Sequence, residues 1–90
     1  HVDAPMDHYV LLYYVNDSDG PTYIFEETKH DRPMEEAYKF DEFNVKETVP
    51  PKKGRFVLFD GSYYHTSSSP VNHPKRMVLN INFPKENVLL

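Results

Sequence analysis

Short runs of β-forming residues, each closed by a cluster of turn residues, are the feature that most limits how this chain of 90 residues can fold. The longest run spans residues 9–15 and ends in the turn sequence Asn-Asp-Ser-Asp-Gly-Pro at 16–21. Runs of this composition and length are typical of β-strands. Further strands are expected at residues 22–27, 44–49, 55–60, 63–67 and 75–83. The pattern predicts a mainly β protein, a sandwich or barrel, with one domain over residues 1–90.

The segment 28–42 interrupts this pattern because charged residues dominate it. Pro33 precedes a few apolar residues, which is compatible with a turn or two of helix that has proline near its start. Otherwise we expect a mobile loop. Binding residues concentrate on loops, so residues 28–43 are the expected place for substrate contacts.

Composition excludes several classes of function. The chain has 14 acidic and 10 basic residues, and its net charge of −4 makes nucleic acid an unlikely partner, because such binding needs a clustered basic surface. The absence of cysteine excludes disulfides, thiolate metal sites and a cysteine nucleophile. No apolar run approaches the roughly 20 residues of a membrane span, and no signal-peptide pattern opens the chain. We therefore expect no membrane association and a cytoplasmic location.

The last expected strand carries large apolar side chains on a face that ought to be solvated. Alternate residues of a strand share a face, and the two sets here are Met77, Leu79, Ile81 and Phe83 on one side, and Arg76, Val78, Asn80 and Asn82 on the other. No long amphipathic helix in these 90 residues can cover the first set. We therefore expect residues 1–90 to be the C-terminal part of a larger domain, with its first strand and covering helices outside this segment, and to fold poorly alone.

Three residues have the types needed for a metal site. His1 and Asp3 are separated by one residue, so on an extended segment their side chains point to the same side. His65, at the end of an aromatic strand, would complete two imidazoles and one carboxylate. This is the facial triad of non-haem Fe(II), which leaves adjacent positions open for a co-substrate and dioxygen. The alternative is that His65 is a strand-end histidine with no role as a ligand.

Arg76 follows His65 by eleven positions and lies in an otherwise apolar stretch. An arginine on the inner face of a barrel is expected to pair with an anion, because burying an unpaired charge is costly. Its planar fork suits a carboxylate. The alternative is an edge arginine that reaches water or a distant aspartate.

Other polar residues receive plainer interpretations. His8, His30 and His73 occupy loop or loop-edge positions and are expected at the surface. The sequence Asp17-Ser18-Asp19-Gly20 is similar to a calcium-binding loop, but it lacks the third oxygen ligand and the flanking helices. We expect an ordinary turn there.

Taken together, His1, Asp3, His65 and Arg76 resemble the motif of the 2-oxoglutarate/Fe(II)-dependent dioxygenases, specifically the prolyl 4-hydroxylase-like branch. The similarity includes the segments 13–16, 51–60, 64–67, 74–76 and 79–83, and so reaches Phe83 and covers nearly all of the chain. The order and the spacing of these segments fit together.

The resemblance implies a fold, a site and a reaction. The fold would be a double-stranded β-helix of the jelly-roll or cupin type, with about eight strands and helices packed outside its larger sheet. Fe(II) would be bound by His1, Asp3 and His65. The co-substrate 2-oxoglutarate would pair through its distal carboxylate with Arg76 and Tyr14, and Asn80 would touch the co-substrate or an ordered water.

The implied reaction is hydroxylation of a C–H bond, with conversion of 2-oxoglutarate and O2 to succinate and CO2 and with ascorbate as a further possible requirement. A prolyl residue of a protein or peptide is the leading substrate, ahead of small molecules and nucleobases. One alternative is a non-catalytic cupin-type barrel that binds a ligand or a structural ion. Another is a zinc hydrolase with water in the open position. Arg76 together with Tyr14 favours the oxygenase, because neither alternative needs a carboxylate clamp.

Overall fold

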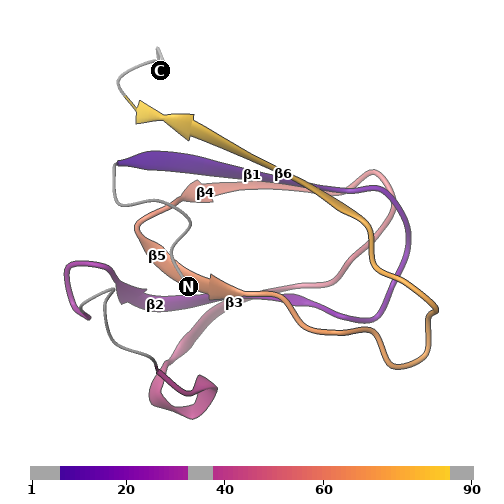
Figure 1. The fold of residues 1–90 in the computed structure, drawn as a ribbon, viewed down its shortest axis with the longest axis horizontal. Helices are drawn as coiled ribbons and strands as arrows, with labels where there is room; N and C mark the ends of the chain where they lie inside the picture. Colours follow the sequence, from indigo (N-terminus) through magenta and orange to yellow (C-terminus); the bar gives the residue numbers. More distant parts are fainter. Residues whose placement is uncertain (1–6, 33–37, 86–90) are drawn as a thin grey trace.

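The computed structural model describes residues 7–32 and 38–85, and these residues form a mainly β protein. Two antiparallel three-stranded sheets face each other, which we call the upper and lower sheets after their positions in Figure 1. The elements, in chain order, are β1 (His8–Tyr14), β2 (Thr22–Thr28), the 3-10 helix η1 (Phe40–Glu42), β3 (Val45–Val49), β4 (Phe56–Asp60), β5 (Tyr63–Thr66) and β6 (Val78–Pro84). The strands predicted from the sequence are thus all present, with ends that differ by up to three residues.

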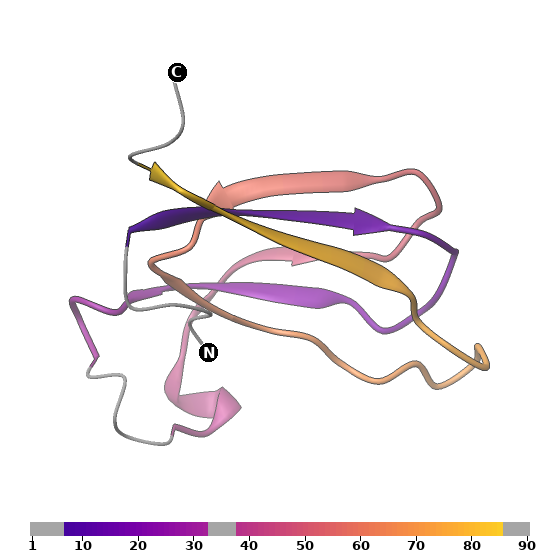
Figure 2. The same ribbon diagram turned by 45° about the horizontal axis from the view of Figure 1, so that its top comes forward.

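Each sheet has its earliest strand in the centre. The upper sheet has the order β4-β1-β6 and the lower sheet the order β3-β2-β5. Figure 2 shows β1 running between β4 and β6. The chain therefore passes repeatedly between the sheets, and strands distant in sequence become neighbours.

The two sheets enclose a small core between their inner faces. Along β1, alternate residues Val10, Leu12 and Tyr14 are buried, as expected for a strand with one face against a partner layer. In the lower sheet Ile24 of β2 pairs directly with His65 of β5, and both are buried. Directly paired residues share a face, so His65 points into the same interior as Ile24.

The outer face of the upper sheet is apolar and exposed. Strand register places Tyr13 between Phe56 and Leu79, and places Leu11 between Leu58 and Ile81. We call this surface the outer upper face, and its exposed members are Tyr13, Phe56, Leu58, Leu79, Ile81 and Phe83, with exposed fractions from 38% to 68%. The expectation that Leu79, Ile81 and Phe83 share an apolar face is confirmed. None of the elements within 7–32 and 38–85 packs over this face.

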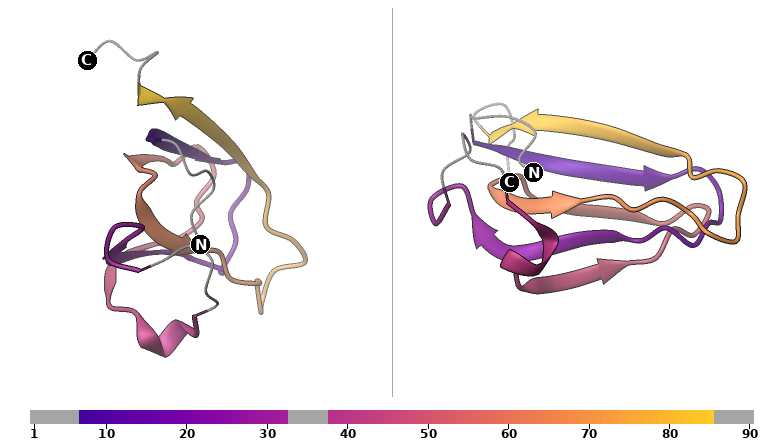
Figure 3. Two further views of the ribbon diagram at one scale, coloured as in Figure 1. Left: turned by 60° about the vertical axis from the view of Figure 1, so that its left-hand side comes forward. Right: turned by 60° about the horizontal axis from the view of Figure 1, so that its bottom comes forward.

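The outer face of the lower sheet is covered by the chain itself. Rings from the connection between β2 and β3 pack on rings of the sheet, and Figures 1 and 3 show η1 on the side away from the upper sheet. We call this group the lower aromatic cover; it consists of Tyr23, Phe25, Tyr38, Phe40, Phe43 and Tyr64. The Phe25 ring stacks on Phe43 at 4.8 Å and meets Phe40 edge-on at 5.4 Å. Such pairs add to the stability that burial alone provides.

Part of the prediction for residues 28–42 needs correction. We expected a mobile loop, but β2 runs to Thr28 and residues 40–42 form a helical turn whose neighbours are packed. The aromatic residues at 38, 40 and 43 explain the difference, because they can bury their rings against the sheet. The helix expected after Pro33 falls on residues 33–37, outside the described residues. No helix in the described part of the chain is long and apolar enough to cross a membrane.

Candidate functional site

A pocket of about 220 Å³ lies between the two sheets, and we call it the inter-sheet pocket. Its walls come from both sheets and from the connection between β5 and β6; the lining residues are Leu12, Thr22, His65, Ser67, Arg76, Val78 and Asn80. Pockets for drug-sized ligands are larger, at roughly 300–1,000 Å³. The size therefore suits a small metabolite.

Three of the six residues singled out from the sequence line this pocket: His65, Arg76 and Asn80. Tyr14 does not line it but contacts two residues that do. His1 and Asp3 lie outside the described residues. Thr22 and Ser67 also line the pocket and were not predicted from the sequence. Thr22 carried a usable signal, because it lies two residues before Ile24 and so places a hydroxyl on the inner face of β2.

The His65 imidazole is held in one orientation by groups from both sheets. Its Nδ1 lies 3.1 Å from the carbonyl oxygen of Tyr63, and the Phe59 ring of β4 meets it edge-on at 5.1 Å. A carbonyl can only accept a hydrogen bond, so in the neutral ring Nδ1 carries the proton and Nε2 carries the lone pair. A histidine that binds metal through Nε2 commonly has this tautomer, fixed by a backbone carbonyl.

The Arg76 guanidinium is bound by neutral oxygens. Its Nε donates to the carbonyl of Gly20 at 2.6 Å and one Nη donates to the Thr22 hydroxyl, while its carbon atom Cζ lies 5.6 Å from the centre of the Tyr14 ring. No carboxylate of residues 7–32 and 38–85 lies within 4 Å of it. The ion pair with a distant aspartate, considered from the sequence, is therefore not found among these residues.

The polar groups of the pocket are biased toward donors. Thr22 Oγ1 accepts from both Arg76 and Tyr14, the latter at 2.7 Å, so both of its lone pairs are used and its own proton is free to be donated. Arg76 uses two of its five donors in these bonds. No acidic side chain is among the described residues that line the pocket. A small anion therefore finds donors here and no competing negative charge.

The histidines set aside from the sequence fall into two groups. His30 is exposed and His73 is half exposed, as predicted. The prediction for His8 was wrong, because this residue begins β1 and is buried. The reason lies in a segment that is distant in the sequence: Gly61 packs so closely against the His8 ring that a Cβ at position 61 would clash with it. A glycine fifty-three positions away thus makes the space for this imidazole.

The described residues contain no group of three or more His, Cys, Asp or Glu side chains able to hold a metal ion. Of the predicted iron ligands they contain His65 alone. None of the known protein-family models matches this chain, and no curated protein or solved structure matches it either. Its site is therefore interpreted from its own residues.

Proposed function

We propose that this chain is part of an Fe(II)/2-oxoglutarate-dependent oxygenase of the prolyl 4-hydroxylase-like kind. It would hydroxylate a C–H bond, with a prolyl residue of a protein or peptide as the leading substrate, while 2-oxoglutarate and O2 become succinate and CO2. The observation that carries the proposal is the donor-rich inter-sheet pocket, where Arg76 and His65 line the same small space.

The strand arrangement supports a double-stranded β-helix for this protein. In that fold consecutive strands cross between two facing antiparallel sheets, so that neighbours within a sheet are not neighbours in sequence. The order β4-β1-β6 and the pair β2-β5 follow this rule, whereas β2 and β3 are consecutive strands that pair within the lower sheet. Among the described residues β6 is an edge strand, which leaves room for a further strand in the upper sheet.

The pocket fits 2-oxoglutarate by size and by chemistry. This molecule is a five-carbon dicarboxylate, and one carboxylate would accept from the remaining Arg76 donors and from the Thr22 hydroxyl. Leu12 and Val78 would pack on its methylene groups and exclude water. Asn80 and Ser67 offer further hydrogen bonds on the same walls.

The iron ligands in this proposal are His1, Asp3 and His65. The tautomer of His65 fits the role, because Nε2 carries the lone pair when Nδ1 donates to Tyr63. When bound, iron supplies the dioxygen chemistry, with ascorbate as a reductant where one is needed. The protein's own contribution is to orient 2-oxoglutarate through Arg76 and Thr22 and to keep the pocket dry.

One observation favours the second candidate, a non-catalytic cupin-type barrel that binds a ligand or a structural divalent ion. Arg76 already has neutral acceptors in Gly20 and Thr22, as an arginine with a purely structural role would have. A barrel that binds an anionic ligand and the oxygenase both predict anion binding in the pocket, and only the oxygenase predicts turnover.

The test measures binding and turnover in the complete protein. Calorimetry without oxygen gives the affinity for 2-oxoglutarate in the presence of Mn(II), and succinate release with Fe(II) and ascorbate is measured over a panel of peptides and small molecules. Replacing Arg76 with Ala removes a charge-assisted contact and is expected to weaken 2-oxoglutarate binding roughly 30- to 1,000-fold. Arg76→Lys keeps the charge but loses the fork, so its affinity is expected to lie between wild type and Arg76→Ala.

Lys75→Ala is the matched control, because Lys75 is the adjacent cation, is exposed and does not line the pocket. It is expected to bind 2-oxoglutarate like the wild type. Unchanged affinity in Arg76→Ala would contradict the proposal. Binding without succinate release from any substrate would favour the non-catalytic barrel. Asp3→Ala, which removes the anionic ligand, is expected to abolish turnover.

A further inference from the structure

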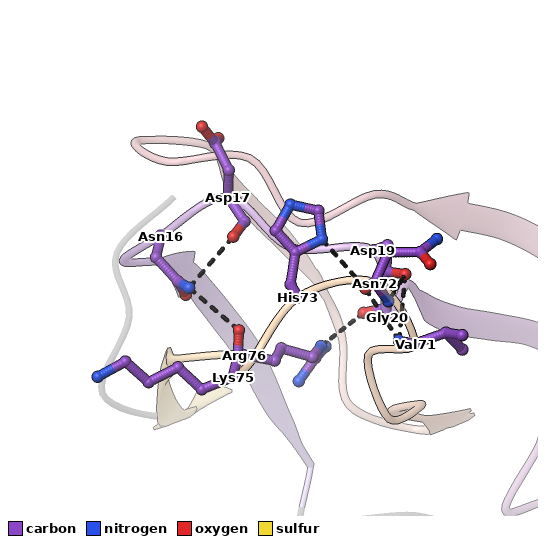
Figure 4. Close-up of polar contacts among 9 residues, drawn as sticks. All are labelled: Asn16, Asp17, Asp19, Gly20, Val71, Asn72, His73, Lys75 and Arg76. Carbon is purple, nitrogen blue, oxygen red and sulfur yellow. Dashed lines mark hydrogen bonds and ion pairs between the residues drawn. The ribbon is translucent and has the colours of Figure 1, made fainter.

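The turn between β1 and β2, residues 15–21, is hydrogen-bonded to the irregular segment 67–77, which carries Arg76 (Figure 4). We infer that Asn16 and Asp19 in this turn are positioning residues for Arg76, and that they set the affinity of the pocket for 2-oxoglutarate without touching it. The inference rests on the proposed function for its ligand, and on the contacts described below for its geometry.

Asn16 holds the backbone on both sides of Arg76. Its Nδ2 donates to the carbonyl of Lys75 at 3.1 Å, and its Oδ1 accepts from the amide of Met77 at 2.8 Å. The amide of Val15 also donates to the carbonyl of Met77 at 2.9 Å. These bonds restrain the peptide units that flank Arg76 and therefore the direction in which its side chain leaves the backbone.

Asp19 holds the same segment a few residues earlier. Its carboxylate accepts from the backbone amides of Val71 and Asn72, at 3.1 Å and 2.7 Å, and lies 3.3 Å from Nδ1 of His73. The bond from the Asn72 amide is the largest cause that lowers the pKa of Asp19 below its ordinary value; burial, the next largest, acts in the opposite direction, and the weaker Val71 and His73 contacts lower the pKa further. The carboxylate is thus charged at neutral pH and suited to holding these amides.

Gly20 links the two functions of the turn. Its carbonyl accepts from Nε of Arg76 at 2.6 Å, so the turn binds the guanidinium as well as the backbone. A Cβ at this position would lie 2.3 Å from the carbonyl oxygen of Ser68. The turn and the segment therefore pack backbone against backbone, and only glycine permits this approach.

The physical reason for such support is the flexibility of arginine. Residues 67–77 form no strand, so the sheet ladders do not fix their path. A binding group gains affinity when its neighbours hold it in the bound geometry, because less freedom is lost when the ligand arrives. Asn16 and Asp19 provide this restraint from the turn between β1 and β2.

The decisive variant is Asn16→Ala, which removes both bonds around Arg76. We expect about tenfold weaker binding of 2-oxoglutarate by calorimetry with Mn(II) in the complete protein, and Mn(II) affinity within about twofold of wild type. Asn72→Ala is the matched control, because Asn72 contributes its backbone amide to the network and that amide remains. It is expected to bind 2-oxoglutarate like the wild type.

A double-mutant cycle separates positioning from a general loss of stability. If Asn16 acts through Arg76, Asn16→Ala causes no further loss of affinity once Arg76 is already alanine. An equal loss in both backgrounds, or unchanged affinity in Asn16→Ala, would overturn the inference. Where Asn16→Ala melts below the assay temperature, Asn16→Asp serves instead: it keeps the acceptor for Met77, loses the donor to Lys75 and is expected to show a smaller loss, about threefold.

A second readout needs no ligand. The Nε–H resonance of Arg76 in a ¹⁵N spectrum, assigned by its loss in Arg76→Lys, reports the bond to Gly20. We expect Asn16→Ala to shift this resonance and speed its exchange with water, and Asn72→Ala to leave it in place. If the wild-type protein fails to bind 2-oxoglutarate while Asn16→Ala still shifts the Arg76 resonance, the proposed function is contradicted and the positioning role is retained. An Arg76 Nε–H resonance that does not move in Asn16→Ala would contradict the positioning role.

Discussion

The outer faces of the two sheets differ in what covers them. On the lower sheet, Phe25 is 2% exposed because Phe40 and Phe43 pack on it. On the upper sheet, Phe56 is 68% exposed and belongs to a continuous apolar surface. Both sheets carry aromatic residues on their outer sides, so residue type does not explain the difference.

The difference follows from the connections. Sixteen residues, 29–44, join β2 to β3, and those around η1 turn back over the lower sheet. Only Gly61 and Ser62 join β4 to β5, and the turn 15–21 and segment 67–77 bind each other at one end of the molecule. Among the described residues, an outer sheet face is therefore buried only where a connecting segment is long enough and aromatic enough to reach it.

The largest expected effect compares two phenylalanines, one from each face. Phe25→Ala removes a buried ring from the lower aromatic cover and is expected to lower the free energy of unfolding by about 3–5 kcal/mol. Phe56→Ala, on the outer upper face, is expected to change it by less than about 1 kcal/mol. Urea-induced unfolding of both variants checks the difference. Similar losses would mean that the upper face is packed in solution.

The second prediction concerns association through the outer upper face. Replacing Phe56, Leu58 and Leu79 with serine is expected to reduce both the binding of a hydrophobic dye and any self-association of the chain by about tenfold. The reason is that serine offers little apolar surface to bury against a dye or a second copy of the chain. Val71→Ser is the control, since Val71 is exposed on a loop away from this face. Dye fluorescence and analytical ultracentrifugation over a range of concentrations measure the effect. Equal dye binding in the triple variant and the wild type would refute it.

A third prediction tests the polar edge of the lower aromatic cover. The Arg32 guanidinium lies 5.3 Å and 4.9 Å from the ring centres of Tyr38 and Phe43, and it donates to the carbonyl of Glu42. Arg32→Met keeps the apolar stem and is expected to cost about 1–2 kcal/mol.

The matched control for Arg32 is Arg55→Met, because Arg55 also donates to a carbonyl, that of Pro50. No ring contact of Arg55 is found within the described ranges. Its loss is expected to be smaller by about 0.5–1 kcal/mol, the share due to the rings. Thermal or urea unfolding of both variants gives the comparison, and equal losses would remove the cation–π contribution.

The smallest effect is a pH dependence at the end of the upper sheet, where Lys85 Nζ lies 2.7 Å from Asp60 Oδ2. Partial burial raises the pKa of Asp60, but bonds from Lys85 and Ser62 outweigh it and bring the pKa below the ordinary 3.8. The bond to Asp60 is the largest cause that raises the pKa of Lys85 above 10.5. The aspartate's contribution is present above about pH 3.8 and lost as pH falls below it, and the lysine's is present below about pH 10.5 and lost above it.

Asp60→Asn is therefore expected to be less stable than wild type by about 0.5 kcal/mol near neutral pH, as for a solvent-screened pair. The difference should disappear below about pH 3, and urea unfolding across the pH range measures it. A difference that persists at low pH would show that charge is not its source.

Much of the fold could be predicted from the sequence because local signals determine strands. The run 9–15 and the turn residues at 16–21 predicted β1 and the turn after it, and alternation predicted that Leu79, Ile81 and Phe83 share a face. Strand pairing could not be predicted, because it depends on contacts such as Tyr9 with Asp60 and Phe83 that span many tens of residues. The burial of His8 was missed for the same reason.

For the candidate site, the sequence by itself determined which residues have suitable chemistry: an imidazole at His65, a fork of donors at Arg76 and an amide at Asn80. Only the tertiary structure placed all three around one pocket with Thr22 and Ser67. It also decided that Arg76 is bound by Gly20 and Thr22 and bracketed by Asn16, about sixty positions away. The physical reason is that residue type and spacing limit what a side chain can bind, whereas its actual partners depend on which distant segments the folded sheets bring together.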